Sequence, residues 1–303
     1  YLKGKALTDT WGVDEIWNEA LGHFRETARI EPEFAPAYAA QSEIYNYFGW
    51  FYPEKGYPAM CEAAARKASE LDPDLPEANT ALATYLFLFE NRYAEADSLF
   101  GKALQAAPGD VDVLGLYRRV LKLSGQCDEA VAVARRAAAL DPLNFAPSRE
   151  LVVTLLNCNA FAESIELVTV LKDVFQGATT HLDYFLAVAY AALGQFDEAM
   201  AAVERTDVDE SGMAFVYWLA GRRDEAWELV GGRDTVDPKS IQQRVALLVL
   251  EEDYDQAMDF LEQGARSRPV LTKFAINNDF LFEPLHDLPR FCELMRSMNI
   301  PGY

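Results

Sequence analysis

Apolar residues recur along the chain at the spacing of amphipathic helices, and five helical segments share one form. Each has an alanine near its start and a proline at its end. The segments are EALGHFRETARIEP (19–32), EAAARKASELDP (62–73), EADSLFGKALQAAP (95–108), EAVAVARRAAALDP (129–142) and QAMDFLEQGARSRP (256–269). Proline does not continue a helix, so each segment predicts a helix that stops just before its proline.

The closing prolines give the length of the repeat. Pro32, Pro73, Pro108 and Pro142 are separated by 41, 35 and 34 residues. A period of 34 residues accommodates two helices, and the first interval holds seven residues more. Regular periods of this length are typical of arrays in which helix pairs stack on their neighbours.

A second helix precedes each segment and ends at a turn. The turns lie in LKLSGQCDEA (121–130), AALGQFDEA (191–199), WLAGRRDEA (218–226) and VLEEDYDQA (249–257). Gly125, Gly194 and Gly221 stand where the C-terminus of a helix favours a positive φ angle. The acidic residues that follow suit the first turn of the next helix. The sequence therefore predicts a series of helix–turn–helix units.

Small residues are expected where the paired helices touch, and larger apolar residues are expected to fill the remaining space. The small residues are Ala103, Ala130, Ala137, Ala187 and Ala199, and the larger ones are Leu82, Phe100, Leu151 and Tyr190. This spacing resembles the tetratricopeptide repeat. The positions that match it are Ala96, Phe100, Ala103 and Pro108, and again Gly125, Ala130, Ala137 and Pro142. The resemblance implies an all-α, right-handed tetratricopeptide-repeat superhelix, an α-solenoid.

Residues 1–270 are predicted to hold about eight helix pairs, and residues 271–303 are predicted to form a C-terminal cap. Residues 143–176 keep the repeat length, with Gln176 in place of the closing proline and Asn159 in place of the turn glycine. Repeats after residue 199 are shorter. Because each repeat contacts mainly its neighbours, the shorter units are expected to bend the array locally.

Four stretches together resemble one bacterial family of signalling proteins. They are YLKGKAL (1–7), GWFYPEKGYPAMCEAAARKASELDP (49–73), LFENRYAEADSLFGKAL (88–104) and FAINNDFLFEPLHDLPRFCELMRSMNIP (274–301). In that family a repeat array follows a class III nucleotide cyclase domain, a winged-helix DNA-binding domain or a Ser/Thr kinase domain. The most specific positions are Phe282, Pro284, Leu285, Asp287, Pro289, Arg290, Phe291 and Met298. The resemblance implies a regulatory or interaction arm whose effector domain precedes Tyr1.

An aromatic insertion at residues 46–58 accounts for the longer first interval. Seven aromatic rings lie in and beside it: Tyr45, Tyr47, Phe48, Trp50, Phe51, Tyr52 and Tyr57. Pro53 and Pro58 exclude a continuous helix there. Most of the rings are expected to cover the open side of the first repeats. The alternatives are a recognition surface and, with no basic flank to favour it, contact with a membrane.

The acidic balance of the chain narrows the classes of partner. With 48 acidic and 27 basic residues the formal charge is −21, which opposes binding to a phosphate backbone and favours basic or cationic partners. No apolar run reaches the roughly 18 residues that span a bilayer. A cytoplasmic location is expected, or a periplasmic one if a membrane segment precedes Tyr1.

Neither an active site nor a metal site is expected. The sequence contains no GxGxxG, GxxxxGK[ST], GxSxG, HExxH or DFG motif, so the chain is predicted not to be an enzyme and to need no cofactor. Its four cysteines, Cys61, Cys127, Cys158 and Cys292, lie far apart without a CxxC pair. They are expected to be free, buried thiols.

The candidate partner-binding residues form a basic group and an aromatic group. Arg118, Arg119 and Lys122 lie on the first helix of the fourth repeat, and Arg149 lies on the first helix of the fifth. First helices line the concave wall of such arrays, so these side chains are expected to hold a carboxylate or phosphate of a bound peptide. The alternative is that they are solvated or paired with nearby acids. Trp50 and Tyr52 in the insertion are a second candidate contact.

Two further patterns are interpreted as structural. Asp255, Asp259 and Glu262 fall on one face of a helix, and a solvated convex face is expected there. Trp218 and Trp227 lie nine residues apart across a turn and are expected to pack within a short repeat.

The sequence thus favours a protein-interaction or regulatory arm that binds a protein or peptide partner. The alternative is a small-molecule sensor that controls an attached cyclase or transcription-regulator domain.

Overall fold

The computed structural model describes residues 1–8, 14–175, 179–206, 213–232, 241–267 and 279–300. Within these ranges the regular elements are all helices, with no strand. The chain divides into two compact units, Tyr1–Ser124 (unit 1) and Gly125–Tyr303 (unit 2). None of the described helices combines the length and the apolar character needed to cross a bilayer. The predicted all-α class is confirmed.

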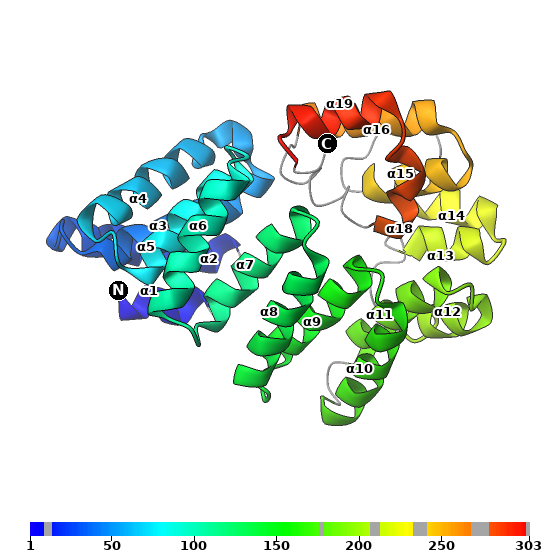
Figure 1. Ribbon diagram of the computed structural model, residues 1–303, viewed down its shortest axis with the longest axis horizontal. Coiled ribbons are helices and arrows are strands. Elements are labelled where there is room, and N and C mark those ends of the chain that lie inside the picture. The colour runs from blue at the N-terminus through cyan, green and yellow to red at the C-terminus, as the bar shows by residue number, and fades with distance from the viewer. Residues whose placement is uncertain (9–13, 176–178, 207–212, 233–240, 268–278, 301–303) are drawn as a thin grey trace. The chain divides into compact units, whose positions relative to one another are not determined.

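Unit 1 is built from successive antiparallel helices (Figure 1). They are α1 (Leu2–Thr8), α2 (Asp14–Ile30), α3 (Ala35–Phe51), the 3₁₀ turn η1 (Pro53–Lys55), α4 (Tyr57–Leu71), α5 (Pro76–Leu88), α6 (Tyr93–Ala106) and α7 (Val111–Leu123). Each helix packs on the next one in sequence, and α5 also contacts α3 and α7. The first helices of the pairs therefore form one layer, with α4 and α6 packed against them.

Unit 2 continues the same pattern. Its elements are α8 (Cys127–Leu140), α9 (Phe145–Asn157), α10 (Phe161–Val174), α11 (Thr179–Ala192), α12 (Phe196–Val203), α13 (Ala214–Leu219), α14 (Arg223–Leu229), α15 (Ile241–Leu250), α16 (Tyr254–Ser267), α18 (Asp279–Phe282), the 3₁₀ turn η4 (Glu283–Leu285) and α19 (Pro289–Ser297). Besides neighbouring pairs, α9 contacts α11, α11 contacts α13 and α13 contacts α15. This alternation of inner and outer helices is the packing expected of stacked helix pairs.

The helices end where the sequence predicts. Helices α2, α4, α6 and α8 each stop two residues before the closing proline of their segment. At the turn between α11 and α12, Gly194 has a φ angle of 74°, which a residue with a side chain adopts only at a cost. Asn159 takes the same conformation, with a φ angle of 59°, at the turn where no glycine is present. Asparagine tolerates this region better than most residues.

Small side chains occupy the helix contacts. Ala103, Ala130, Ala187 and Ala199 are fully buried, and Phe100 is only 1% exposed. The alanines allow the helix backbones to approach, while the phenylalanine ring fills the space beside them. The predicted division between small contact residues and large filling residues is therefore confirmed at these positions.

The later repeats are short, as predicted. Helices α12, α13 and α14 contain 8, 6 and 7 residues. Trp218 and Trp227 pack against the main core of unit 2, and the Trp227 indole N–H donates to Glu251 Oε1 at 2.8 Å. Their predicted packing role is confirmed.

The C-terminal segment packs like one more helix pair. Helix α18 contacts α15, and α19 contacts α16. Four apolar side chains of this segment are buried: Phe282, Leu285, Phe291 and Met295. The predicted cap begins at residue 271, which lies outside the described residues, so that boundary stays a prediction.

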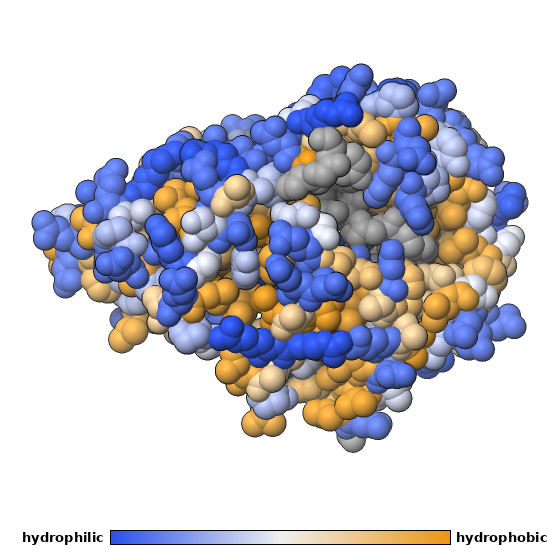
Figure 2. Space-filling view, in the orientation of Figure 1, coloured by the Kyte–Doolittle hydropathy of each residue, from blue (hydrophilic) through white to orange (hydrophobic). Residues whose placement is uncertain are grey.

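Several large apolar side chains are exposed on the outer helices of unit 2. Figure 2 shows apolar surface gathered at one end of α8 and α10, where Leu140 and Val174 are 48% and 59% exposed. Single exposed apolar side chains are common on soluble domains. The outer surface of unit 2 is therefore not uniformly polar.

We predict opposite effects for two glycine substitutions. Gly194→Ala should lower the free energy of unfolding by about 1 kcal/mol, because its positive φ angle strains a residue with a Cβ atom although nothing lies within 4 Å of that atom. Gly101→Ala, in the interior of α6 and also without a neighbour within 4 Å, should raise it by about 0.5 to 1 kcal/mol. Urea unfolding of both variants measures this difference, and equal shifts would contradict it.

Candidate functional site

The predicted basic group lies on α7. Asp110 caps this helix by accepting hydrogen bonds from the backbone N–H groups of Asp112 and Val113 at 3.0 and 3.1 Å. One turn apart on the helix, Arg118 and Lys122 are buried, with exposed fractions of 2% and 9%. Arg119 is half-buried. The three cationic groups therefore differ in access to solvent, and Arg119 is the most accessible.

Arg119 lies over an aromatic ring from the predicted insertion. Its guanidinium carbon is 6.0 Å from the centre of the Trp50 ring, at the outer limit of a cation–π contact. Trp50 is in the last turn of α3, and its indole N–H donates to Asn46 Oδ1 at 2.9 Å. The sequence predicts the basic group and the aromatic insertion as two separate candidate contacts. In the structure, Arg119 of the basic group lies beside Trp50 of the insertion, within unit 1.

Most of the other aromatic rings near the insertion pack within unit 1. The Tyr47 and Tyr52 hydroxyl groups donate to the two carboxylate oxygens of Asp14 at 3.3 and 3.0 Å. Phe48 is 2% exposed, and its ring centre lies 5.1 Å from that of Tyr57. Burial, followed by the nearby Asp14 charge, raises the pKa of Tyr47. These rings serve mainly to attach α2 and α4 to α3.

Arg149 belongs to unit 2, whereas Arg119 and Lys122 belong to unit 1. Arg149 is exposed on α9, and its guanidinium group pairs with the carboxylate of the adjacent Glu150 at 2.8 Å. Of the predicted partner-binding residues, the structure therefore brings Arg119 and Trp50 together, whereas Arg149 pairs with Glu150.

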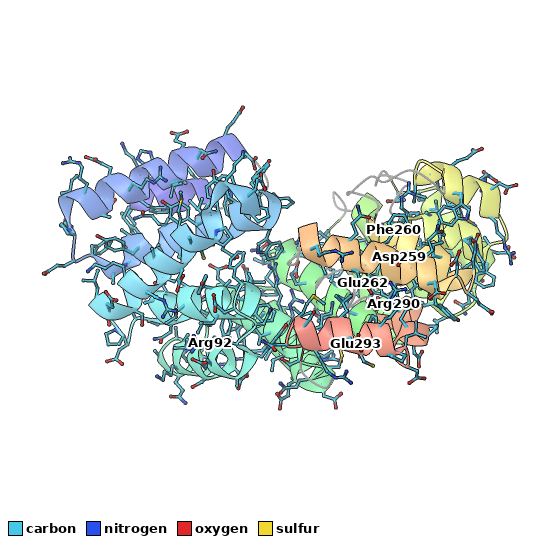
Figure 3. The ribbon with its side chains drawn as sticks, turned by 90° about the horizontal axis from the view of Figure 1, so that it is seen from above. Arg92, Asp259, Phe260, Glu262, Arg290 and Glu293 are labelled. Carbon is cyan, nitrogen blue, oxygen red and sulfur yellow. A yellow bond between two sulfur atoms is a disulfide. The ribbon has the colours of Figure 1, made fainter. Side chains whose placement is uncertain are left out.

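The acidic face of α16 is an attachment site for the C-terminal segment. Arg290 of α19 reaches across it, with distances of 3.6, 2.7 and 3.0 Å to carboxylate oxygens of Asp255, Asp259 and Glu262. Figure 3 shows Arg290 beside Asp259 and Glu262. The hydrogen bonds that Arg290 donates to Asp259 and Glu262 raise the pKa of Arg290. The expected solvated face holds for Asp255 and Asp259, whose side chains are 99% and 72% exposed, but one cation from the next helix pair also contacts all three acids.

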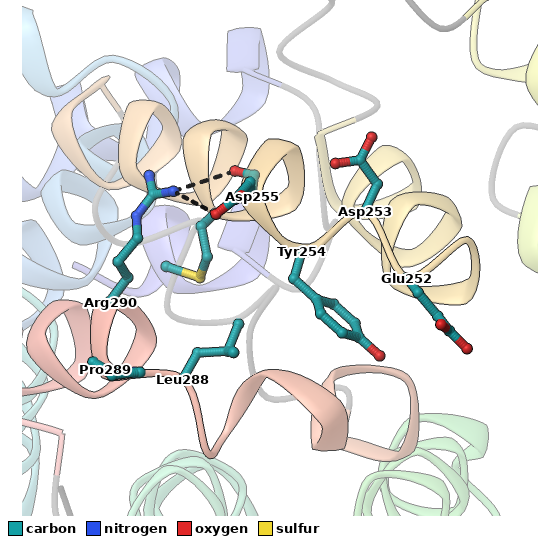
Figure 4. Close-up of a pocket in the computed structure, with 8 residues that line it drawn as sticks. Glu252, Asp253, Tyr254, Asp255, Leu288, Pro289 and Arg290 are labelled. Atoms are coloured by element: carbon teal, nitrogen blue, oxygen red, sulfur yellow. Dashed lines mark hydrogen bonds and ion pairs between the residues drawn. The ribbon is translucent and has the colours of Figure 1, made fainter.

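A shallow hollow of about 350 Å³ lies beside this contact. Figure 4 shows Tyr254 and the acidic side chains of Glu252 and Asp253 on one side, with Leu288 and Pro289 on the other. Its acidic lining disfavours anionic ligands. Within the described ranges, no group of three or more His, Cys, Asp and Glu side chains is arranged to hold a metal ion.

Two of the four cysteines form a disulfide, which corrects the prediction of four free thiols. Cys127 and Cys158 are bonded, with Cα atoms 5.6 Å apart. Each lies beside the turn of a successive repeat, near Gly125 and Asn159, and stacking brings these turns together. The sequence signal was the placement of both cysteines beside equivalent turns. Cys61 and Cys292 are free.

A buried carboxylate that the sequence analysis missed links three helices of unit 2. Asp183 of α11 is 3% exposed. It accepts hydrogen bonds from Lys172 Nζ of α10 at 2.8 and 2.9 Å, and from Arg205 Nε, just after α12, at 2.9 Å. A buried charge requires such partners. Its sequence signal was an aspartate inside an otherwise apolar helix.

The comparisons with known proteins establish the repeat class. Residues 87–142 match the family described as tetratricopeptide repeat. The cellulose synthase operon protein C of Pseudomonas fluorescens (strain SBW25) is 33% identical over 93 residues, which cover 31% of this chain and 7% of that protein. The chain therefore matches only a small fraction of the length of this curated relative.

Two solved structures are similar in fold. Yeast Tom70 superposes with a TM-score of 0.54 and 20% identity over 94% of this chain and 63% of the other. A tetratricopeptide repeat protein from Parabacteroides merdae ATCC 43184 has a TM-score of 0.54 and 12% identity over 78% of this chain and 98% of the other. At these identities the likeness shows the fold alone. The chain contains a tetratricopeptide-repeat domain and has the predicted α-solenoid fold.

We predict that the attachment of α19 depends on ionic strength. Arg290→Gln should increase hydrogen exchange in α19 at low salt, because three carboxylates lose their shared cation. The difference should disappear in about 1 M salt, where the Debye length is about 3 Å. Arg29→Gln is the control, since Arg29 pairs with Glu26 of its own helix. An Arg290→Gln effect that is unchanged in high salt would contradict an ionic contact.

We also predict that Cys61 resists alkylation in the folded chain. It is fully buried beside Ser42, and burial raises the pKa of its thiol to about 12. Iodoacetamide at pH 8 should modify Cys61 only after unfolding, whereas the half-buried Cys292 is the internal comparison. Since the folded state favours the neutral thiol, the stability that this group contributes falls as the pH rises from the ordinary thiol pKa towards 12. Rapid native labelling of Cys61 would refute this prediction.

Proposed function

We propose that this chain is a non-catalytic interaction arm that binds a protein or peptide partner through the Trp50–Arg119 surface. We define this surface as Asn46, Trp50 and Arg119. Lys122, three residues after Arg119 on α7, is buried and adds positive charge at short range. The observation that carries the proposal is the guanidinium group of Arg119 over the ring of Trp50, 6.0 Å from its centre. Tryptophan and arginine are enriched among residues that dominate binding energy. Tetratricopeptide-repeat proteins generally mediate protein–protein interaction and are generally non-catalytic scaffolds.

The chemistry of this surface favours one kind of partner. A guanidinium group binds a carboxylate through parallel N–H donors in its plane, and the indole ring supplies a rigid apolar contact. The overall charge of −21 repels an acidic partner that approaches within about a Debye length of 8 to 10 Å, and salt screens this repulsion at larger distances. The partner therefore presents a single acidic or C-terminal group here, with apolar or basic residues beside it.

The remaining candidate residues are expected to contribute less to partner binding than Arg119 and Trp50. Arg118 is buried on the same helix as Arg119 and adds positive charge at short range. Tyr52 is held by Asp14, and Lys55 Nζ lies 4.3 Å from the centre of its ring, so its role is mainly architectural. Arg149 extends the binding site only if the partner also reaches α9.

The resemblance to bacterial signalling proteins supports a regulatory role for the arm. We propose that it serves an attached cyclase, winged-helix or kinase domain of a larger bacterial protein. The curated relative is also bacterial. The Cys127–Cys158 disulfide favours an oxidising compartment such as the periplasm over the cytoplasm, because cytosolic thiols are kept reduced.

We predict that charge reversal at the centre of the surface weakens partner binding. A partner captured from lysate and identified by mass spectrometry would be titrated calorimetrically against the parent, Arg119→Glu and Trp50→Ala chains. Arg119→Glu should weaken binding by a few kcal/mol, since a charge-assisted contact is lost and a repulsive one is added. Arg66→Glu is the matched control, because Arg66 pairs with Glu62 within α4 of the same unit. Equal affinity for the parent and Arg119→Glu, with unchanged melting temperatures, would exclude this surface.

Two additional measurements test the extent of the binding site and the alternative function. Arg149→Glu, alone and combined with Arg119→Glu, tests whether the partner also contacts α9. A metabolite panel in a thermal-shift assay tests the alternative function. A small molecule that raises the melting temperature, with no protein captured, would favour the sensor.

A further inference from the structure

The Cys127–Cys158 disulfide ties the N-terminal end of α8, the first helix of unit 2, to the C-terminal end of α9. Cys127 is the first residue of α8, and Cys158 follows the last residue of α9. The short turn at residues 141–144 joins the other ends of these two helices. Helix α8 is therefore connected covalently to α9 at both ends.

The apolar contact between α8 and α9 is modest. The buried residues of α8 are three alanines, Ala130, Ala134 and Ala137. Ala134 packs with Leu151 and Leu155 of α9 in a small cluster, and the half-buried Val131 and Ala138 of α8 pack against the same cluster. Alanine side chains remove little apolar surface from water, so the disulfide is a substantial part of what holds α8 in place.

One polar contact of α8 with a neighbouring helix is exposed to solvent. Arg135 pairs with Glu163 of α10, and the two side chains are 52% and 40% exposed. Exposed ion pairs are weak and are screened by salt. This contact therefore does not replace the covalent one.

A reductant in solution can reach the disulfide. Cys127 and Cys158 are half-buried, whereas the free Cys61 is fully buried. Thiol–disulfide exchange requires access of an attacking thiolate to one of the two sulfur atoms. The difference in burial makes the disulfide, rather than Cys61, the accessible redox site of these three cysteines.

We propose that the Cys127–Cys158 disulfide is a reducible lock that holds α8 on α9. A dithiol reductant, either a small molecule or a protein, attacks one sulfur atom through its thiolate and forms a mixed disulfide. Its second thiolate then displaces the remaining cysteine, so the dithiol becomes a disulfide. Cys127 and Cys158 together receive two electrons and two protons and become thiols.

Reduction leaves α8 attached to α9 only by the turn and by non-covalent contacts. The helix then separates from α9 more often and exposes Leu151 and Leu155, which are 7% and 0% exposed in the locked form. The lock therefore controls local order at the start of unit 2.

Hydrogen exchange with mass spectrometry on the full chain tests this lock. The oxidised protein would be compared with protein reduced by dithiothreitol and then capped with iodoacetamide, and intact mass would count the capped thiols. Exchange in α8 should become at least about tenfold faster after reduction, because local opening no longer requires the disulfide to break. Exchange in α2–α6 and α11–α16 should stay unchanged, and reoxidation before capping should restore slow exchange in α8.

Matched variants distinguish the lock from a general effect of the reductant. Cys127→Ser/Cys158→Ser should show fast exchange in α8 without reductant, and Cys292→Ser should behave like the parent in both redox states. If the double variant does not fold, the reduced parent chain still provides the measurement. Unchanged exchange in α8, a uniform increase throughout unit 2, or absence of the disulfide from the purified chain would each overturn the proposal.

Discussion

The close contact between alanine-faced helices is the interaction on which the rest of the structure depends. Ala65, Ala96, Ala130 and Ala199, on α4, α6, α8 and α12, are fully buried. A larger side chain at such a position would force neighbouring backbones apart, because protein interiors are packed without spare volume. Each alanine contributes little burial on its own, so stability accumulates from the number of stacked pairs.

Stacking alone leaves one face of the first and of the last described helix pair uncovered, and different contacts cover these two faces. At the start, Gly4 of α1 lies so close to Phe24 that a Cβ atom there would be 2.5 Å from the ring. The Tyr1 ring also contacts Phe24, with ring centres 5.7 Å apart. At the other end, Phe291 is buried and Arg290 engages three carboxylates of α16. A glycine contact covers the first pair, and an apolar and ionic contact covers the last.

The sequence predicts local features well and contacts between repeats poorly. Helix ends follow from Pro108 or Asn159, because the conformational preferences of proline and asparagine act within one turn. The role of Arg290 and the Cys127–Cys158 bond depend on which faces stack. From the sequence alone, the row of carboxylates on α16 predicts a solvated surface, because the sequence does not show that α19 packs beside it. Arg119 and Trp50 were both candidates, but their proximity follows from the packing of α5 between α3 and α7.

Arginine side chains lie over aromatic rings at several places in both units. The distances from the guanidinium carbon to the ring centre are 5.6 Å for Arg25 and Tyr45, and 4.5 Å for Arg223 and Trp218. A guanidinium group stacked on a ring keeps its N–H donors directed in its own plane. Arg25 also donates from Nε to the hydroxyl of Tyr45, the ring that it lies near, at 3.0 Å. Lysine has no such plane and cannot combine stacking with directed donors. One arginine side chain can therefore both pack on a ring and bind a partner. Trp50 can likewise pack within unit 1 and contribute to the proposed binding surface, so these two interpretations of the aromatic insertion are compatible.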